Sequence, residues 1–217
     1  MNISKTLGKV VIVTGAGSGL GYAMTRALLQ ERYRVVAVDR HSGRIKELID
    51  QSGEAEGNLL PMCVDLSDSS SSREVVDKAI AAFGTIHALV NNAGVSNAIV
   101  RPNFRHENVM FWDVPEDKWD TMFDINVKAP FLLAKAAVPF MIEQKWGRIV
   151  NVTTSLDTMI RPAWTPYGPS KAALEAASSN WAGDLRDKGV TVNILIPGGP
   201  ANTNLVPISE AERSKLI

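Results

Sequence analysis

The sequence predicts an α/β fold, a doubly wound parallel sheet of the Rossmann type with helices on both faces. Short runs rich in valine and isoleucine alternate with longer helical stretches, and a polar or glycine-rich segment follows most of these runs. Such near-continuous apolar strands are typical of parallel sheets that helices cover on both faces. Because ligands of these sheets bind beyond the carboxyl ends of the strands, we expect the segments after the strands to form one site.

Six strands are predicted, at residues 9–14, 34–39, 59–65, 87–91, 148–153 and 191–197. Helices are expected between them at residues 19–30, 44–51, 70–83, 116–144 and 166–188, the fourth broken near Asn126. No repeat or linker divides the chain, so residues 1–217 are interpreted as one dinucleotide-binding and catalytic domain.

The composition argues against several classes of partner. The 23 basic residues balance 23 acidic ones, so no overall field favours nucleic acid or an anionic membrane. The apolar runs look shorter than the ~20 residues of a membrane span. A single cysteine, Cys63, excludes an internal disulfide, and no cluster has zinc-site spacing. We expect a soluble, cytoplasmic protein without a metal, in which Cys63 is a buried structural thiol.

A glycine-rich turn joins the first strand to the first helix. Its spacing, Gly15-x-x-x-Gly19-x-Gly21, lets the backbone approach a pyrophosphate at the helix N-terminus. Asp39 ends the second strand, where a carboxylate can bind the ribose hydroxyls of NAD and repel the 2′-phosphate of NADP. Arg40 could instead pair with that phosphate, so NAD is the predicted cofactor and NADP the alternative.

A tyrosine and a lysine share one face at the start of the last predicted helix. Tyr167 and Lys171 are four residues apart, and Pro166 and Pro169 fit only a first helical turn. A neighbouring ammonium and an oxidised nicotinamide both favour the phenolate, so we expect them to bring the pKa of Tyr167 nearer working pH than the ~10 of a free phenol. This pair predicts a proton-transferring site.

Together these segments resemble the short-chain dehydrogenase/reductase family over nearly the whole chain. The resemblance implies an oxidoreductase in which Tyr167 exchanges a proton with an alcohol or ketone and Lys171 holds the nicotinamide ribose. It also implies that Asn126 kinks its helix and holds a water leading to the lysine. A hydroxyl that binds the substrate oxygen is expected at Thr154 or Ser155. The implied cofactor-binding residues are Gly15, Gly17, Ser18, Gly19, Leu20, Gly21, Asp39, Arg40, Asp65, Leu66, Asn92, Ala93, Gly94, Tyr167, Lys171, Pro197, Gly198 and Thr203.

The substrate cannot be named from the sequence. The segment 95–117 is longer than the resemblance implies and carries several aromatic residues; it is either a surface excursion or a substrate wall, to which Met159, Trp164 and Gly199 also contribute. The predicted function is interconversion of a secondary alcohol and a ketone. The alternatives are an NADP-linked 3-oxoacyl reductase and a non-catalytic nucleotide sensor.

Assembly and the end of the chain give the last expectations. Small residues recur at helical spacing on the last predicted helix, at Ala173, Ala176, Ala177, Asn180 and Gly183. With the resemblance, this stripe predicts a homodimer or homotetramer. The chain ends inside what the resemblance implies is a substrate-covering helix, so we expect a longer natural protein with a final strand.

Overall fold

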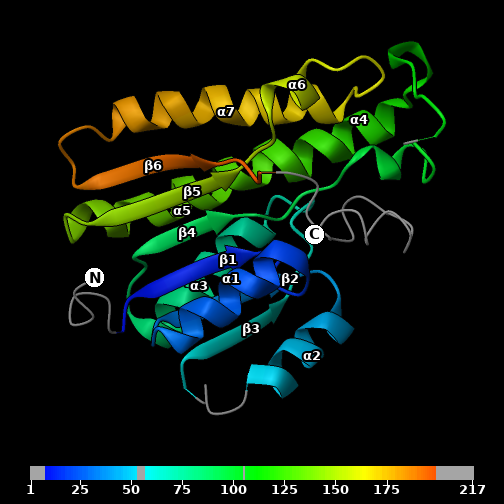
Figure 1. Cartoon of the computed structure of the whole chain (residues 1–217). Helices are drawn as coiled ribbons and strands as arrows, with labels where there is room; N and C mark the ends of the chain where they lie inside the picture. Colours follow the sequence, from blue (N-terminus) through cyan, green and yellow to red (C-terminus); the bar gives the residue numbers. More distant parts are fainter. Residues whose placement is uncertain (1–7, 53–56, 105, 199–217) are drawn as a thin grey trace.

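Six parallel strands form one sheet in the order β3-β2-β1-β4-β5-β6, as Figure 1 shows. The computed structural model describes residues 8–52, 57–104 and 106–198. The strands are β1 (Val10–Thr14), β2 (Arg34–Asp39), β3 (Leu59–Cys63), β4 (Ala88–Asn91), β5 (Gly147–Val152) and β6 (Val190–Leu195). The order reverses between β1 and β4, which creates the switch point where ligands of this fold bind. The predicted fold class is therefore confirmed.

Helices cover the sheet on both faces. Helices α1 (Gly19–Gln30) and α2 (Ser42–Ser52) pack on β1 and β2, over a core that includes Val11, Val13 and Leu48. Helices α3 (Ser71–Phe83), α5 (Ala129–Glu143) and α7 (Tyr167–Asp184) lie on the other face, over a larger core. The central strands β1, β2 and β4 have nearly continuous hydrophobic sequences because side chains on both of their faces are buried.

One long helical stretch has the length and composition of a membrane span, although lysines interrupt its apolar runs as the sequence indicated. From Glu116 to Glu143 the chain is helical for 28 residues, and its most apolar 18-residue window has a mean hydropathy of 1.4, so by length and composition it could cross a membrane. It comprises α4 (Glu116–Phe123), the π-helical turn η4 (Asp124–Lys128) and α5. Leu133 and Met141 of α5 are fully buried in the core of the protein. Packing against the sheet therefore buries 44% of the apolar window.

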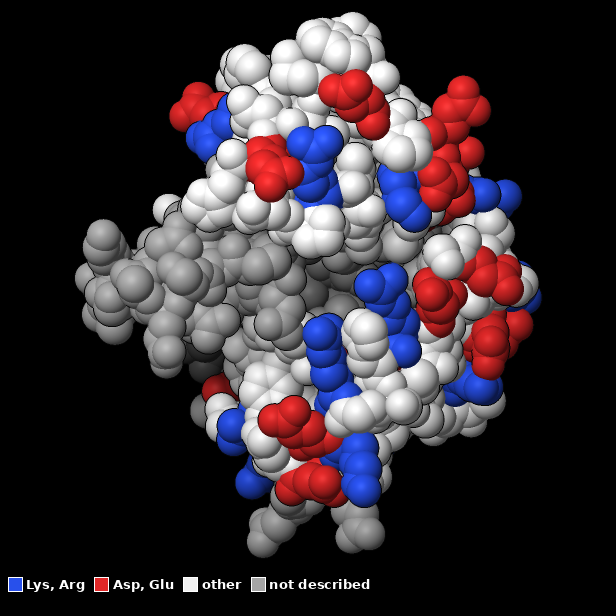
Figure 2. Space-filling view, turned by 90° about the vertical axis from the view of Figure 1, so that its right-hand side faces the viewer, with Lys and Arg blue, Asp and Glu red and all other residues white. Residues whose placement is uncertain are grey.

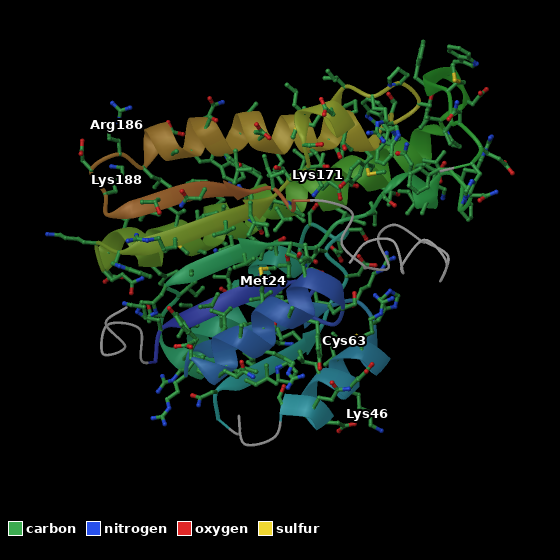
Figure 3. The ribbon with its side chains drawn as sticks, viewed as in Figure 1. Met24, Lys46, Cys63, Lys171, Arg186 and Lys188 are labelled. Atoms are coloured by element: carbon green, nitrogen blue, oxygen red, sulfur yellow. The ribbon has the colours of Figure 1, made fainter. Side chains whose placement is uncertain are left out.

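Two sequence expectations about burial are wrong. Cys63 is exposed at the end of the outer strand β3, where its thiol donates to the carbonyl of Arg40 over 3.6 Å (Figure 3). The strand β6 lies at the opposite edge of the described sheet and exposes alternate residues, among them Leu195. A strand at the edge of a sheet has a neighbour on one side only. The hydrophobic composition of β3 and β6 therefore predicted more burial than these two edge strands have.

Short helical turns fill the connections near the switch point. They are η2 (Asn97–Ile99) and η3 (Phe111–Asp113) after β4, and α6 (Leu156–Met159) after β5. These turns lie at the carboxyl ends of the strands, on the side of the molecule that also carries the start of α7 (Figure 1). They supply the surroundings of the candidate site.

Candidate active site

The glycine-rich turn is shaped by close approaches of the main chain. A side-chain Cβ at Gly21 would lie 2.0 Å from the carbonyl oxygen of Gly15, and one at Gly15, whose φ is +64°, would lie 2.9 Å from the Asn92 amide. A Cβ at Gly17 would lie 3.0 Å from the Asp39 carboxylate. These three positions therefore exclude larger residues for local steric reasons.

The start of α1 fits an anionic ligand. Ser18 has an extended backbone and makes no side-chain cap, and the first turn contains no acidic residue. The first N–H groups of a helix have no partner within it, so here they point outward beside Gly17 and Gly19. A dinucleotide pyrophosphate is the kind of group that this turn suits. Figure 2 views these strand ends, where Lys and Arg side chains border a hollow.

Asp39 is fixed beside the same turn. One carboxylate oxygen accepts the N–H of Gly17 over 3.1 Å and the other accepts the N–H of His41 over 3.0 Å. The side chain of Arg40 is exposed and bonds His41, so it does not pair with Asp39. Arg44, which the sequence reasoning missed, lies close by, since a Cβ on Gly17 would be 2.7 Å from the Arg44 Cβ. Arg44 lies in the first turn of α2, directly after β2. This position is the signal that could have identified it as a residue beside the glycine-rich turn.

A threonine and an asparagine lock β1 to β4 at their carboxyl ends. The Thr14 hydroxyl accepts the N–H groups of Asn92 and Ala93 at 3.0 and 2.9 Å, and the Asn92 amide donates to the Thr14 carbonyl over 2.9 Å. Thr14 itself is buried. This lock holds the segment Asn92 to Gly94 against the glycine-rich turn, where the sequence predicted it.

The predicted tyrosine and lysine lie together in the protein interior. Tyr167 is 6% and Lys171 4% exposed, and the lysine Nζ lies 5.9 Å from the centre of the tyrosine ring. The Lys171 ammonium donates to the Val152 carbonyl over 2.9 Å. A Cβ on Gly94 would lie 3.4 Å from it, so the lysine also adjoins the segment after β4. Figure 3 shows Lys171 between α7 and the sheet.

Burial controls the protonation of this pair. Desolvation raises the pKa of Tyr167 to about 12, and a hydrogen bond from the Thr154 side chain opposes the rise only in part. Burial lowers the pKa of Lys171 to about 8. The expected lowering of the tyrosine pKa is therefore not found in the free protein, because the cost of burying a phenolate exceeds the effect of its neighbours.

The structure separates the two candidate hydroxyls. Thr154 hydrogen-bonds Tyr167. Ser155 instead caps α6, where its hydroxyl accepts the N–H of Thr158 over 3.4 Å and bonds the Thr158 hydroxyl over 3.1 Å. Thr154 is thus the hydroxyl placed at the tyrosine, while the oxygen of Ser155 is engaged in a helix cap.

Asn126 lies fully buried in the π-helical turn η4. Its side chain bonds both main-chain groups of Val95, over 2.9 and 3.0 Å, and donates to the Ser170 hydroxyl over 3.0 Å. Ser170 in turn donates to the carbonyl of Tyr167 over 2.7 Å. The predicted helix break is therefore a π turn that joins the segment after β4 to the catalytic helix.

A second buried chain of hydrogen bonds anchors α7 to the sheet. Asn91 donates to Asn151 over 2.8 Å, Asn151 donates to Ser178 over 2.7 Å, and Ser178 donates to the Leu174 carbonyl over 2.6 Å. Sequence reasoning missed Asn151 and Ser178. The only signal for Asn151 is that it is a polar residue inside an apolar strand, and the only signal for Ser178 is that it lies on the buried face of a helix.

The remaining predicted cofactor residues are less closely grouped. Asp65 is exposed and caps the turn at Ser67, whereas the side chain of Leu66 packs in the core. Pro197 and Gly198 follow β6 at the strand ends. Thr203 and the wall residue Gly199 lie outside the described residues.

The long segment after β4 has both a buried and an exposed part. Phe104 is 4% exposed and packs edge-on against Trp164, whose ring lies 6.0 Å from that of Tyr167. Phe111 and Trp112 are more than 60% exposed. A hollow of about 280 Å³ adjoins them, lined by Phe111, Val114, Glu116, Trp119 and Asp120. The segment is therefore packed against the tyrosine at one end and open to solvent at the other.

A doubly wound sheet with a glycine turn at its switch point, and a buried tyrosine–lysine pair beside it, defines a dinucleotide-dependent oxidoreductase. The sequence profile of the short chain dehydrogenase family matches residues 9–213. The chain belongs to this family, whose members act on CH–OH groups with NAD or NADP.

Three relatives illustrate the match. The chain is 32% identical over 191 residues to 3-oxoacyl-[acyl-carrier-protein] reductase FabG of Thermotoga maritima, covering 88% of this chain and 74% of that one. A metagenomic short-chain oxidoreductase in complex with NADP superposes with a TM-score of 0.80 and 30% identity, over 89% of this chain and 84% of that one. A Burkholderia phymatum short chain dehydrogenase/reductase in complex with NAD gives 0.78 and 27%, over 88% and 66%.

Proposed function

We propose that this protein interconverts a secondary alcohol and a ketone by hydride transfer, with Tyr167 as the acid/base. The observation that carries the proposal is the burial of Tyr167 beside Lys171, whose Nζ lies 5.9 Å from the centre of the tyrosine ring, with the half-buried Thr154 hydrogen-bonded to Tyr167. A buried proton donor, a hydroxyl bonded to it and a nearby ammonium are the groups that a carbonyl oxygen requires as it gains or loses a proton.

The dinucleotide would be held by the glycine-rich turn, Asp39 and Lys171, and it supplies a hydride acceptor or donor. In the reductive direction Tyr167 gives its phenolic proton to the carbonyl oxygen as the hydride reaches the carbonyl carbon. In the oxidative direction the phenolate takes the hydroxyl proton and the C–H bond breaks with its electron pair. Thr154 hydrogen-bonds the reacting oxygen. Lys171, with a pKa of about 8, stays mostly protonated at pH 7 and favours the phenolate.

Removal of the phenolic oxygen tests this function. Tyr167→Phe should lower kcat by about 1,000-fold, within the range for general acid–base catalysis, and leave the dissociation constant for NAD(H) within about threefold. The assay follows reduced nicotinamide absorbance with panels of secondary alcohols and ketones. Full activity in Tyr167→Phe would contradict the role, and cofactor binding without turnover on any substrate would favour a nucleotide sensor.

NAD is the proposed physiological cofactor because Asp39 occupies the end of β2 with its carboxylate fixed by two main-chain N–H groups. Arg40 and Arg44 could serve a 2′-phosphate and support NADP as the alternative. Titration of both reduced cofactors by fluorescence decides the question: at least about tenfold tighter NADH binding, or 1.4 kcal/mol, supports NAD. In Asp39→Ser this preference should fall or reverse.

An NADP-linked 3-oxoacyl reductase is the second candidate, favoured by the similarity to the Thermotoga maritima enzyme. A 3-oxoacyl thioester assayed beside simple ketones distinguishes the two functions. A preference for the thioester of more than about 100-fold in kcat/KM, about 2.7 kcal/mol, would replace the first candidate by the second.

A homodimer through α5 and α7, or a tetramer built from it, is also proposed. The small-residue stripe on α7 is accessible: Ala176, Asn180 and Gly183 are exposed, and a Cβ on Gly183 would meet nothing within 4 Å. Phe131 of α5 is 45% exposed and adjoins Trp181 of α7. Light scattering should give a dimer or tetramer at micromolar concentration, and Ala176→Arg should dissociate it; a monomeric native protein would contradict the proposal.

A further inference from the structure

The helix that carries the tyrosine begins without a cap of its own. Tyr167 is the first residue of α7, and Pro166 occupies the N-cap position, where its side chain cannot accept a hydrogen bond. The first N–H groups of a helix need partners from outside it, and leaving one unpaired in the interior costs about 1–3 kcal/mol. Tyr167 is buried, so water cannot readily serve.

Each N–H group of this first turn nevertheless has an identifiable partner. Gly168 donates to the Trp164 carbonyl over 2.8 Å, and Ser170 donates to the Pro166 carbonyl over 3.1 Å. Pro169 has no N–H group. The remaining donor, the N–H of Tyr167, bonds the side-chain Oδ1 of Asn97 over 3.3 Å. The cap of α7 therefore comes from η2, seventy positions earlier in the chain.

Asn97 holds both ends of the turn that leads into α7. Its Nδ2 donates to the carbonyl of Ala163 over 3.3 Å, and Ala163 has a left-handed φ of +63°. The Asn97 side chain is fully buried. One amide thus fixes the main chain at residues 163 and 167, on either side of the turn. An apolar replacement of its oxygen would leave the buried N–H of Tyr167 unpaired, and loss of its NH₂ group would release the half-buried carbonyl of Ala163.

Packing around this amide connects it to the segment after β4. Trp164 lies between Phe104 and Tyr167, with ring-centre separations of 5.5 and 6.0 Å. Val95 and Tyr167 belong to one small cluster of buried residues against which Ile99 of η2 also packs. The segment after β4 and the start of α7 therefore form one packed unit.

We propose that Asn97 is a positioning residue that sets the geometry of Tyr167 by capping α7 from η2. The inference rests on the proposed acid/base role of Tyr167. A phenolic oxygen displaced by a fraction of an ångström from its substrate transfers a proton less efficiently, and a displacement near 1 Å can lower the rate by about 100-fold. The effect should be much larger in kcat than in cofactor binding, because Asp39 and the glycine-rich turn lie on other elements and Lys171 of α7 is separately anchored to the Val152 carbonyl.

The test uses the full chain in three variants. Asn97→Leu keeps the volume and removes both hydrogen bonds, Asn97→Asp keeps the acceptor for the Tyr167 N–H, and Asn103→Leu makes the same change at an exposed position of the same segment. Hydrogen exchange of the Tyr167 amide, resolved by NMR, reports the cap directly. Steady-state kinetics and the dissociation constant for reduced nicotinamide dinucleotide are measured on the same samples.

Asn97→Leu should speed hydrogen exchange of the Tyr167 amide at least about tenfold relative to the amides of residues 174–184. This expectation follows because losing one hydrogen bond changes the opening equilibrium by about tenfold. It should lower kcat about 10- to 100-fold and leave cofactor affinity within about threefold. Asn97→Asp should retain the protection of this amide, and Asn103→Leu should resemble the native protein. If Asn97→Leu does not fold, Asn97→Ala takes its place.

Native exchange at Tyr167 in Asn97→Leu, native kcat in that variant, or equal losses in Asn103→Leu would overturn the proposal. Exchange that rises throughout α7, in step with general destabilisation, would also overturn it. If the native protein turns over no alcohol or ketone, the proposed function fails, whereas the exchange measurement still decides whether Asn97 caps the helix.

Discussion

The nucleotide side and the catalytic side of the site are built in different ways. Around the glycine-rich turn, function depends on main-chain groups and on the absence of side chains, as the 2.0 Å approach at Gly21 illustrates. Around Tyr167, it depends on buried polar side chains, such as Asn126 and Asn97, that come from distant parts of the chain. The first side depends on close main-chain approaches, such as those of Gly15 to Asn92 and of Gly17 to Asp39, whereas the second depends on hydrogen-bonded side chains buried between several elements.

The difference extends to electrostatics. Asp39 is supported by two main-chain N–H groups on adjoining loops. Tyr167 and Lys171 have pKa values of about 12 and 8, moved in opposite directions by the same burial. Burial therefore keeps the Tyr167 phenol protonated and makes the Lys171 ammonium easier to deprotonate. In the free protein Tyr167 is thus a proton donor. Both sides can be perturbed separately.

After the loss expected for Tyr167→Phe, the largest expected effect is on the catalytic side and distinguishes the adjacent hydroxyls of Thr154 and Ser155. Thr154→Ala should lower kcat/KM by about 100-fold, about 2.7 kcal/mol, because Tyr167 and the reacting oxygen lose a hydrogen bond. Ser155→Ala should leave kcat/KM within about threefold and lower the free energy of unfolding by about 1 kcal/mol through loss of the α6 cap. Kinetics and urea unfolding of both variants check this, and equal kinetic losses would contradict it.

On the nucleotide side, added volume should matter more than side-chain chemistry. Gly21→Ala forces a methyl group against the Gly15 carbonyl and should lower the free energy of unfolding by about 2 kcal/mol and NADH affinity at least about tenfold. The matched control is Gly43→Ala on α2, whose Cβ would meet nothing within 4 Å. That change should be neutral or stabilising by about 0.5 kcal/mol. Urea unfolding and fluorescence titration measure both; a neutral Gly21→Ala would refute the steric argument.

A more gradual effect, spread over about two pH units, is a pH dependence of stability from Lys171. Its folded pKa of about 8 lies below the unfolded value of 10.5, so between these values the unfolded chain binds more protons and stability rises with pH. Lys171→Met lacks this group. From pH 8 to pH 10 the native protein should therefore gain about 2 kcal/mol relative to the variant, up to the onset of other titrations. Paired urea unfolding curves measure the gain, and a constant difference would contradict the burial effect.

The sequence by itself was sufficient for the fold class, the family and the nucleotide turn. Alternating apolar strands and helices reflect burial on both faces, and the glycines of the turn follow one another within residues 15–21, so each leaves a signal in a short stretch of sequence. The groups that exclude a Cβ at Gly15 and Gly17 nevertheless come from distant parts of the chain. Tyr167 and Lys171 were also visible, because their spacing places both on one turn of a helix.

Only the tertiary structure decided what depends on neighbours from elsewhere in the chain. It assigned Thr154 to Tyr167 and Ser155 to a helix cap, exposed Cys63 at a sheet edge and buried one face of the apolar helix α5. It also joined Asn97 to the first N–H of α7. Composition records how polar a residue is, whereas burial, pKa and hydrogen-bond partners depend on which distant groups fill the space around it.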